Sequence, residues 1–181
     1  MASQIMRESL TRYIMLQVVV GTDAQSGFLK RELPMSGVDV TTQAGIARSV
    51  EEVAAYSANP DNAPAWYENI KSVEWKTPPP LAVGSRVAFV AHFLGKKLAY
   101  VYEIVEFVPG KRLTMRTSEG PFPMETTYMW ESVSGGKTRI SLRNHGFPVG
   151  FSKLMAPFMS LAMRRANRKD LIRLRELLEQ Q

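Results

Sequence analysis

Apolar and polar residues alternate along the middle of the chain, from residue 72 to residue 143, as they do in strands that bury one face. Turn-forming residues divide this region into six predicted strands, at residues 72–76, 86–94, 98–108, 111–118, 124–133 and 138–143. The strongest turn signals between them are Pro109-Gly110 and Gly135-Gly136. Most neighbouring segments are separated by only a few residues, whereas parallel neighbours need a long crossover. The segments are therefore expected to pair as antiparallel hairpins.

The residues before this region predict one strand and two short helices. Residues 38–49 are rich in β-branched side chains and are expected to form a strand. Ser49 is then a candidate N-cap, with acidic residues in the first helical turn, where the helix dipole favours them. This helix is expected to end near Asn59-Pro60, because proline has no amide hydrogen to donate. A second short helix, capped by residues 61–64, is predicted over 65–70.

The last segment, residues 151–181, has a helical period. Its apolar residues form two stripes that lie more than about 90° apart around the helix axis. The first stripe contains Phe151, Leu154, Met155, Phe158, Leu161 and Ala162, and the second contains Leu171, Leu174, Leu177 and Leu178. One straight helix with a single buried face does not account for both stripes. Either the helix bends at Pro157 or its two halves pack against different surfaces.

The predicted order of elements is one strand, two short helices, six strands and one long helix, or β-α-α-β6-α. An antiparallel sheet with helices gathered on one face belongs to the α+β class. A curved sheet of about seven strands is expected to wrap round the C-terminal helix and to leave a cavity between them.

The first 34 residues do not continue this pattern. Their one apolar run, residues 13–20, is far shorter than the about 20 residues needed to span a bilayer. Arg7 and Arg12 precede the run as in a secretory signal, but Glu8 interrupts the basic region and no small-residue cleavage site follows. Residues 1–34 are interpreted as an N-terminal extension that is poorly ordered or separate from the core, or as a stretch upstream of a start at Met35. Residues 35–181 are predicted to form a single cytoplasmic domain.

The stretch from Ala47 to Glu179 resembles the SRPBCC superfamily, the helix-grip proteins that include START lipid-transfer domains, pollen-allergen-like ligand binders and polyketide cyclases. The resemblance is carried by Trp66 after the Asn-Pro-Asp turn, by the turn at residues 109–113, and by the order of the segments ARSVEEVAAYSANPDNAPAWYENIKSVEW, YEIVEFVPGKRLTMRT and RLRELLE. It implies a helix-grip fold with a ligand cavity. The superfamily shares its fold far more than any activity, so the resemblance transfers function poorly.

Composition removes several kinds of catalytic site. The chain has no cysteine, which excludes a disulfide scaffold, a thiolate zinc site and a cysteine nucleophile. Its two histidines, His92 and His145, leave little room for a histidine metal site or a conventional catalytic triad. No nucleophile elbow, P-loop, dinucleotide fingerprint or zinc-protease motif occurs. The sequence therefore predicts no metal and no cofactor.

Aromatic and methionine residues of the predicted sheet and long helix are the candidates for a ligand site. Each of them also fits ordinary core packing, but ligand pockets are lined mostly by such residues, and the helix-grip resemblance favours a pocket for the set as a whole. The candidates are Trp66, Phe89, Phe93, Tyr100, Tyr102, Met115, Tyr128, Trp130, Met155, Phe158 and Met159. The alternation of a strand does not say which of its faces points inward.

Acid–base candidates are weak. Glu103 and Glu106 lie three positions apart on the longest predicted strand and are expected on opposite faces, which disfavours a paired-carboxylate site. A single buried Glu103 with a raised pKa is still suited to act as a general base, although a surface charge is the simpler interpretation. Tyr102 on the same strand is a further candidate.

The two histidines lack a visible acid–base partner in the sequence. His92 has the opposite parity to Phe89 and Phe93, so it faces solvent if those rings face the cavity. His145 precedes the long helix near the expected cavity mouth, and an ordinary turn residue is the simpler interpretation.

The formal charge of +6 is concentrated at the C-terminal end, because residues 151–181 hold seven basic and three acidic residues. The basic residues that cluster there are Arg164, Arg165, Arg168, Lys169, Arg173 and Arg175. A solvated helix face is the simplest interpretation, and docking on an anionic membrane is the main alternative. Nucleic acid is disfavoured, since no aromatic residue stands among these six to stack on bases.

Three functions follow as hypotheses. The first is binding, transport or sequestration of a hydrophobic or amphipathic small molecule or lipid between the curved sheet and the C-terminal helix. The second is a polyketide cyclase or dehydratase that uses Glu103, His92 or Tyr102, as the resemblance permits. The third is an interaction module that docks acidic surfaces through residues 164–175. The scarcity of catalytic residue types favours the first.

Overall fold

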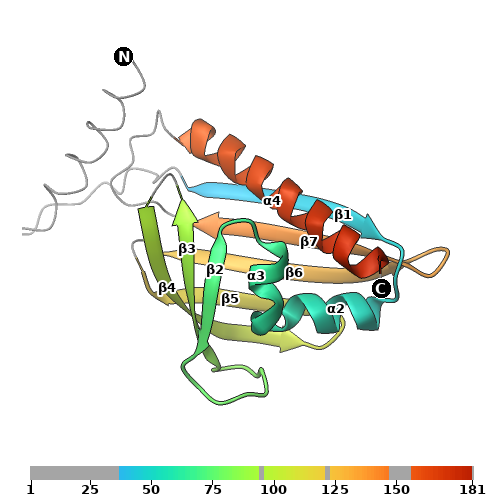
Figure 1. Ribbon diagram of the computed structural model, residues 1–181, viewed down its shortest axis with the longest axis horizontal. Coiled ribbons are helices and arrows are strands. Elements are labelled where there is room, and N and C mark those ends of the chain that lie inside the picture. Colours follow the sequence, from blue (N-terminus) through green and yellow to red (C-terminus); the bar gives the residue numbers. More distant parts are fainter. Residues whose placement is uncertain (1–36, 94–95, 121–122, 147–155, 181) are drawn as a thin grey trace, which may run out of the picture.

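The computed structural model describes residues 37–93, 96–120, 123–146 and 156–180. Seven strands, three α-helices and one short 3-10 helix follow one another along these residues (Figure 1). In chain order they are β1 (Val38–Ile46), α2 (Val50–Ala58), η1 (Pro60–Asn62), α3 (Ala63–Trp66), β2 (Ile70–Trp75), β3 (Arg86–Phe93), β4 (Lys96–Val108), β5 (Arg112–Glu119), β6 (Met124–Val133), β7 (Lys137–Gly146) and α4 (Ala156–Glu179). The order matches the β-α-α-β6-α prediction, so the α+β helix-grip class is confirmed. Residues 1–34, interpreted above as an extension, lie outside the described residues.

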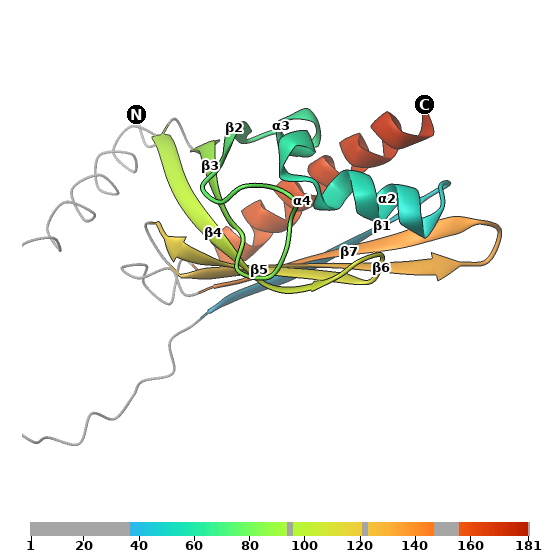
Figure 2. The same ribbon diagram turned by 90° about the horizontal axis from the view of Figure 1, so that it is seen from below.

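The seven strands form one antiparallel sheet in the order β1-β7-β6-β5-β4-β3-β2. Among these strands, only the pairing of β1 with β7 joins two that are far apart in the sequence, and it closes the N-terminal strand onto the C-terminal one. The sheet curls, and α2, α3 and α4 all lie on its concave side (Figure 2). The fold is therefore a half-barrel that holds its helices on one face.

The first helix begins where the sequence predicts. Ser49 is its N-cap and forms a capping box, in which the Glu52 amide donates to Ser49 Oγ (3.3 Å) and the Ser49 amide donates to Glu52 Oε2 (3.0 Å). The helix ends at Ala58, before Pro60, as expected. The second helix differs from its prediction over 65–70: it covers only Ala63–Trp66, and Ile70 already pairs with Ala91 in the sheet. Residues 67–70 therefore leave the helix, and Ile70 forms sheet hydrogen bonding with β3 in place of a further helical turn.

The long helix α4 packs along β1 (Figure 1). Its second apolar stripe is buried as predicted, with Leu171, Leu174 and Leu178 in the main core. The predicted burial of the first stripe is wrong for the members that the structure describes, because the side chains of Phe158 and Leu161 are 67% and 48% exposed. Phe151, Leu154 and Met155 lie outside the described residues.

A bend at Pro157 was one of the two alternatives for this segment, but Pro157 lies in the first turn of α4, which runs as one helix from Ala156 to Glu179. Its buried face continues from Leu171 back through Asp170 and Asn167, two polar residues that hydrophobic periodicity assigns to solvent. Each of them is hydrogen-bonded on the concave side, and this makes their burial possible.

Two long-range hydrogen bonds connect the helices to the sheet. The Trp130 indole N–H on β6 donates to Ser57 Oγ on α2 (2.9 Å), and the Ser57 hydroxyl donates to the Val53 carbonyl (2.6 Å). At the far end of α4, the Glu179 carboxylate accepts a hydrogen bond from the Ala47 amide, just after β1 (2.7 Å). These bonds hold α2 and the end of α4 against the concave side of the sheet.

Candidate functional site

An apolar pocket of about 150 Å³ lies on the concave side of the sheet. Its roof comes from the end of α2, from η1 and α3, and from Tyr67 just after α3; its floor comes from inward-facing residues of β2 to β7 and from Leu81. No described side chain of α4 lines it. The expectation of a cavity between the sheet and the C-terminal helix is therefore corrected: the pocket lies between the sheet and the α2–α3 segment, because these short helices pack over the middle of the concave face.

Six of the eleven predicted ligand residues line this pocket. They are Trp66, Phe89, Tyr100, Tyr102, Met115 and Tyr128. Their rings contact one another: Trp66 and Tyr128 meet edge to face with centroids 6.3 Å apart, and Phe89 and Tyr102 do the same at 5.9 Å. Edge-to-face contacts of this kind stabilise the arrangement of the rings in the pocket wall.

The other five predicted residues do not line the pocket as described. Trp130 is buried beside it, stacked against Tyr128, but its indole faces Ser57. Phe158 is exposed, and Met159 is half-buried and lies outside the pocket wall. The Phe93 side chain and Met155 lie outside what the structure describes.

Two tyrosines join their hydroxyl groups in the pocket wall. Tyr67 Oη and Tyr128 Oη form a hydrogen bond with each other, and the Tyr67 ring stacks on Trp66 with centroids 3.9 Å apart. Burial raises the pKa of both phenols well above the usual value. Both hydroxyl groups are therefore protonated donors at any physiological pH.

A second polar chain reaches the pocket from α4. The Asn167 amide donates to Asn144 Oδ1 (2.8 Å), and the Asn144 amide donates to Thr126 Oγ1 (3.0 Å). Asn144, Thr126 and Tyr102 all line the pocket. Burial raises the pKa of Tyr102, and a hydrogen bond with Thr126 opposes that effect. The pocket is thus apolar with a few fixed neutral polar groups, which is the usual composition of a small-molecule site.

A buried carboxyl group lies near the tyrosine pair. Asp170 on α4 is 3% exposed and accepts a hydrogen bond from the Glu68 amide (3.0 Å). Burial raises the pKa of Asp170 to about 6, and the hydrogen bond from the Glu68 amide is the largest opposing effect. The negative charge of Glu68 adds to the rise, and the positive charges of Arg173 and Lys169 oppose it. Its charge also contributes to the raised pKa values of Tyr67 and Tyr128. The carboxyl group does not line the pocket itself.

Only one of the three acid–base candidates reaches the pocket. Tyr102 lines it, whereas Glu103 pairs with Arg116 in the β4–β5 register and so shares its outer face. His92 is exposed and has the outward parity, as expected from its position relative to Phe89. His145 pairs with Asp39 of β1 in the sheet register. The hydrogen bond from Arg143 lowers the pKa of the Asp39 carboxyl group, burial opposes this, and His145 makes a smaller lowering contribution.

A β-bulge in β4 changes the expected placement of the two glutamates. The register shifts between Ile104 and Glu106, so that Ile104 faces Met115 inward while Glu106 faces Thr114, whose hydroxyl donates to its carboxylate (3.1 Å). Glu103 and Glu106 therefore share the outer face, and the prediction of opposite faces is wrong. The extra residue of the bulge resets the alternation.

The outer face of the sheet carries a broader hollow of about 590 Å³. Its charges are mutually paired: Arg112 with Glu106 (3.6 Å), Arg116 with Glu125 (2.6 Å), and Arg143 with Asp39 (2.8 Å). Exposed pairs of this kind contribute little to stability, and the charges of this hollow already have partners of opposite sign. The smaller, apolar, concave-side pocket is therefore the candidate functional site.

Within the described ranges, no group of three or more metal-binding side chains gathers at one place. Nor does any helix there have the length and apolar character that crossing a bilayer requires.

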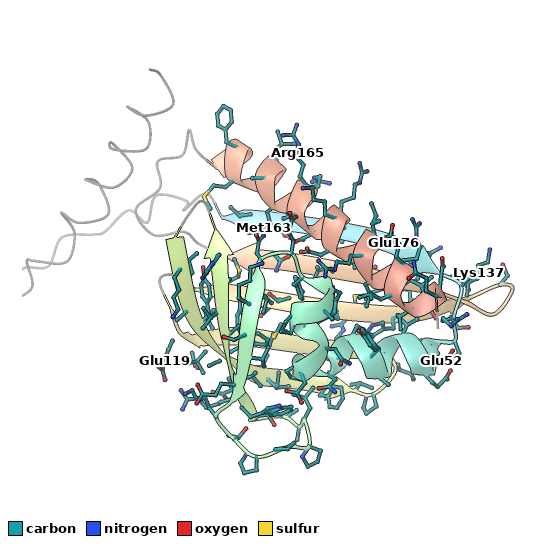
Figure 3. All side chains as sticks on the ribbon, in the orientation of Figure 1. Glu52, Glu119, Lys137, Met163, Arg165 and Glu176 are labelled. Carbon is teal, nitrogen blue, oxygen red and sulfur yellow. The ribbon has the colours of Figure 1, made fainter. Side chains whose placement is uncertain are left out.

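The basic residues of α4 are displayed on its surface. Arg164, Arg165, Arg168, Lys169 and Arg173 are exposed, and Figure 3 shows Arg165 pointing away from the sheet. Phe158 and Leu161 are exposed one turn before them, and Ile172 follows at 38%. The exposed face of α4 therefore combines apolar and basic side chains.

Sequence reasoning missed several residues of the pocket, above all Tyr67, Asn144 and Thr126. Tyr67 follows the candidate Trp66 directly in the chain, and this position could have identified it as a pocket residue. No sequence pattern identifies Asn144 or Thr126, because their place in the pocket wall depends on the pairing of β6 with β7.

The model of a family described as "Polyketide cyclase / dehydrase and lipid transport" matches residues 37–179 of the chain. No curated protein matches it. Among solved structures, TTHA0849 from Thermus thermophilus has a TM-score of 0.66 at 22% identity, covering 76% of this chain and 94% of that one. A START superfamily protein from Mycobacterium smegmatis has a TM-score of 0.68 at 12% identity, covering 78% and 97%. The Zhui aromatase/cyclase from Streptomyces sp. R1128 has a TM-score of 0.66 at 14% identity, covering 79% and 94%. At these identities the three structures show a shared fold.

Proposed function

The chain belongs to the family of polyketide cyclases, dehydrases and lipid-transport proteins, and on this basis we propose that it binds a hydrophobic or amphipathic small molecule in the concave-side pocket. The observation that carries the proposal is the pocket wall, in which Trp66, Phe89 and Tyr102 surround a space with only neutral polar groups. Binding is driven by burial of apolar surface, while the polar groups set orientation. Transport or sequestration of the bound molecule follows from the same site.

The size of the pocket limits what it holds. Its volume of about 150 Å³ is similar to that of a cavity that accommodates a single benzene ring. A ring-sized ligand, or the ring-bearing end of a longer one, fits the space between α3 and the sheet.

Native mass spectrometry of freshly purified protein tests the proposal. The expected result is a protein peak with an added small-molecule mass, which organic extraction releases. Ala91→Phe on β3 places a ring into the pocket and is expected to remove that mass. Ala88→Phe on the outer face of the same strand is the matched control and is expected to retain it. Wild type without any bound mass, together with failure to bind added aromatic probes, contradicts the proposal.

Catalysis is the second candidate function, and the Tyr67–Tyr128 pair in the pocket wall favours it. Of the acid–base residues predicted for a cyclase or dehydratase, Tyr102 alone lines the pocket. Burial raises its pKa, so the Tyr102 hydroxyl is protonated at neutral pH and is suited to donate a hydrogen bond to a reacting oxygen rather than to act as a base. Turnover of a poly-β-ketone thioester by wild type, and its loss in Tyr102→Phe, is the test. Equal turnover by both proteins contradicts a role for Tyr102, and no turnover by wild type contradicts the enzymatic function.

We also propose that the exposed face of α4 docks on an anionic membrane surface. Phe158 and Leu161 are positioned to enter the interface, and the arginines that follow are positioned to meet anionic headgroups. Membrane docking is consistent with exchange of an apolar molecule between the protein and a membrane. Binding to anionic vesicles that weakens with salt is the expected property.

A further inference from the structure

The hydroxyl groups of Tyr67 and Tyr128 carry two protons, and the hydrogen bond between them uses only one. Whichever oxygen donates in that bond, the proton of the other has no second acceptor among the described residues. Both residues line the pocket, so the remaining proton is available to a molecule inside it.

The neighbouring polar groups do not absorb this proton. Ser57 Oγ accepts from the Trp130 indole and Asn144 Oδ1 accepts from Asn167, and within the described residues neither oxygen is hydrogen-bonded to the tyrosine pair. The indole N–H of Trp66 is buried, and among the described residues it too lacks an acceptor. The wall around Trp66 and the tyrosine pair therefore has a surplus of donors, and buried donors without acceptors cost stability until a bound group supplies one.

The pocket offers nothing to a charged ligand. None of the described residues that line it is an Asp, Glu, Lys, Arg or His. The nearest carboxyl group, Asp170, adds negative charge near the tyrosine pair, which repels an anion. Taking a carboxylate or phosphate out of water without a cationic partner is strongly unfavourable.

We infer that the pocket selects an uncharged ligand whose ring fills the apolar space and whose acceptor oxygen, a ketone or a hydroxyl, bonds to the Tyr67–Tyr128 pair. This inference rests on the proposed ligand-binding function and narrows it. It separates neutral oxygen-bearing ring compounds from fatty acids and phospholipid headgroups.

Three probes of matched size test the inference: acetophenone, which is neutral and has a ketone oxygen; cumene, which replaces the acetyl group by isopropyl; and benzoate, which is an anion. Each is titrated into the full-length protein and followed by two-dimensional amide NMR. Acetophenone is expected to bind roughly three- to tenfold more tightly than cumene, as one additional hydrogen bond to a buried donor allows. Benzoate is expected to bind most weakly.

The variant Tyr67→Phe/Tyr128→Phe removes both hydroxyl groups and keeps both rings. It is expected to bind cumene about as well as wild type does, which shows that it folds, and to lose the preference for acetophenone. Tyr56→Phe, which alters a half-buried tyrosine outside the pocket wall, is the matched control and retains the preference.

The outcomes separate the inference from the function on which it rests. Equal affinity of wild type for acetophenone and cumene, or tightest binding of benzoate, overturns the inference and leaves the ligand site standing. A preference for acetophenone that persists in the double variant overturns the role of the tyrosine pair. Failure of all three probes to bind overturns the proposed function itself.

Discussion

Tyr67 and Tyr128 are hydrogen-bonded through their hydroxyl groups although they are 61 positions apart in the chain. Tyr67 follows α3 in the roof of the pocket, and Tyr128 lies on β6 in its floor. The bond therefore joins roof and floor at the candidate site. This hydrogen bond is expected to stabilise the fold, in addition to the ligand contact inferred above.

A double-mutant cycle on this pair is expected to show coupling. Tyr67→Phe or Tyr128→Phe alone leaves a buried hydroxyl group without its partner and is expected to lower the free energy of unfolding by about 1–3 kcal/mol. The double variant removes both groups and is expected to cost about 1 kcal/mol less than the sum of the single changes. Urea unfolding of the four proteins measures this. Strict additivity contradicts the hydrogen bond.

Ser57→Ala is expected to destabilise the fold, because it leaves the buried Trp130 indole N–H without an acceptor. The expected loss is about 1–3 kcal/mol. Ser72→Ala, at an exposed position on β2, is the matched control and is expected to change the free energy of unfolding by less than about 0.5 kcal/mol. Thermal and urea denaturation give both values, and equal effects of the two substitutions contradict the role of Ser57.

Asp170 predicts a specific pH dependence of stability. Its pKa in the folded protein is about 6, above the ordinary value of 3.8, so the folded state binds this proton more tightly than the unfolded state does. Its contribution to stability is thus fully present below about pH 4 and is lost as the pH rises to about 6. Asp170→Asn removes this loss and keeps an oxygen that can accept from the Glu68 amide.

Urea unfolding of wild type and Asp170→Asn across pH 4 to 7 tests this expectation. The difference between their unfolding free energies is expected to shift in favour of the variant by on the order of 2 kcal/mol over that range. The exposed charges around Asp170, namely Glu68, Lys169 and Arg173, are the same in both proteins. A difference that does not vary with pH contradicts the raised pKa.

Vesicle co-sedimentation tests the α4 surface. Wild type is expected to bind mixed phosphatidylcholine–phosphatidylserine vesicles at low salt, and to bind neither phosphatidylcholine alone nor mixed vesicles at high salt. Phe158→Ser/Leu161→Ser removes the exposed apolar pair and is expected to weaken binding about tenfold or more. Val83→Ser, at another apolar residue that is 63% exposed, is the matched control.

A second pair of variants separates the effect of the α4 arginines on vesicle binding from the effect of the protein's net charge. Arg164→Gln/Arg165→Gln is expected to reduce vesicle binding several-fold per charge, since each basic residue near an anionic surface contributes about 1 kcal/mol. Lys111→Gln/Lys137→Gln removes the same charge from two exposed positions outside α4, the turn before β5 and the start of β7, and is expected to leave binding nearly unchanged (Figure 3 labels Lys137). Equal effects of the two variants contradict docking through α4, as does the absence of binding at low salt.

Local patterns predicted most of the elements. The strand over residues 124–133 has the predicted bounds, and the α2 helix starts at the predicted cap Ser49. In both places the signal lies within a few residues: alternation for a strand, a capping box for a helix. The helix predicted over residues 65–70 stops at Trp66, and Ile70 instead pairs with Ala91 of β3 in the sheet.

The candidate site was predicted in part. Six aromatic and methionine residues were found because rings are the usual lining of a pocket. Phe158 was misplaced, because the buried face of α4 runs through Asn167 and Asp170, whose partners Asn144 and the Glu68 amide lie on other elements. Glu103 and Glu106 were predicted on opposite faces because the alternation of apolar and polar residues does not reveal the one-residue bulge in β4 that places both on the outer face.

The sequence by itself determined the class of fold, the order of its elements and the kind of residue available for a site, because these depend on periodicity, capping and composition within short windows. Only the tertiary structure decided that the pocket lies under α3 rather than under α4. It also decided that Tyr67 meets Tyr128, and that Asp170 lies buried near them. These relationships join residues some 40 to 100 positions apart, and the curl of the sheet, which no local pattern encodes, brings them together.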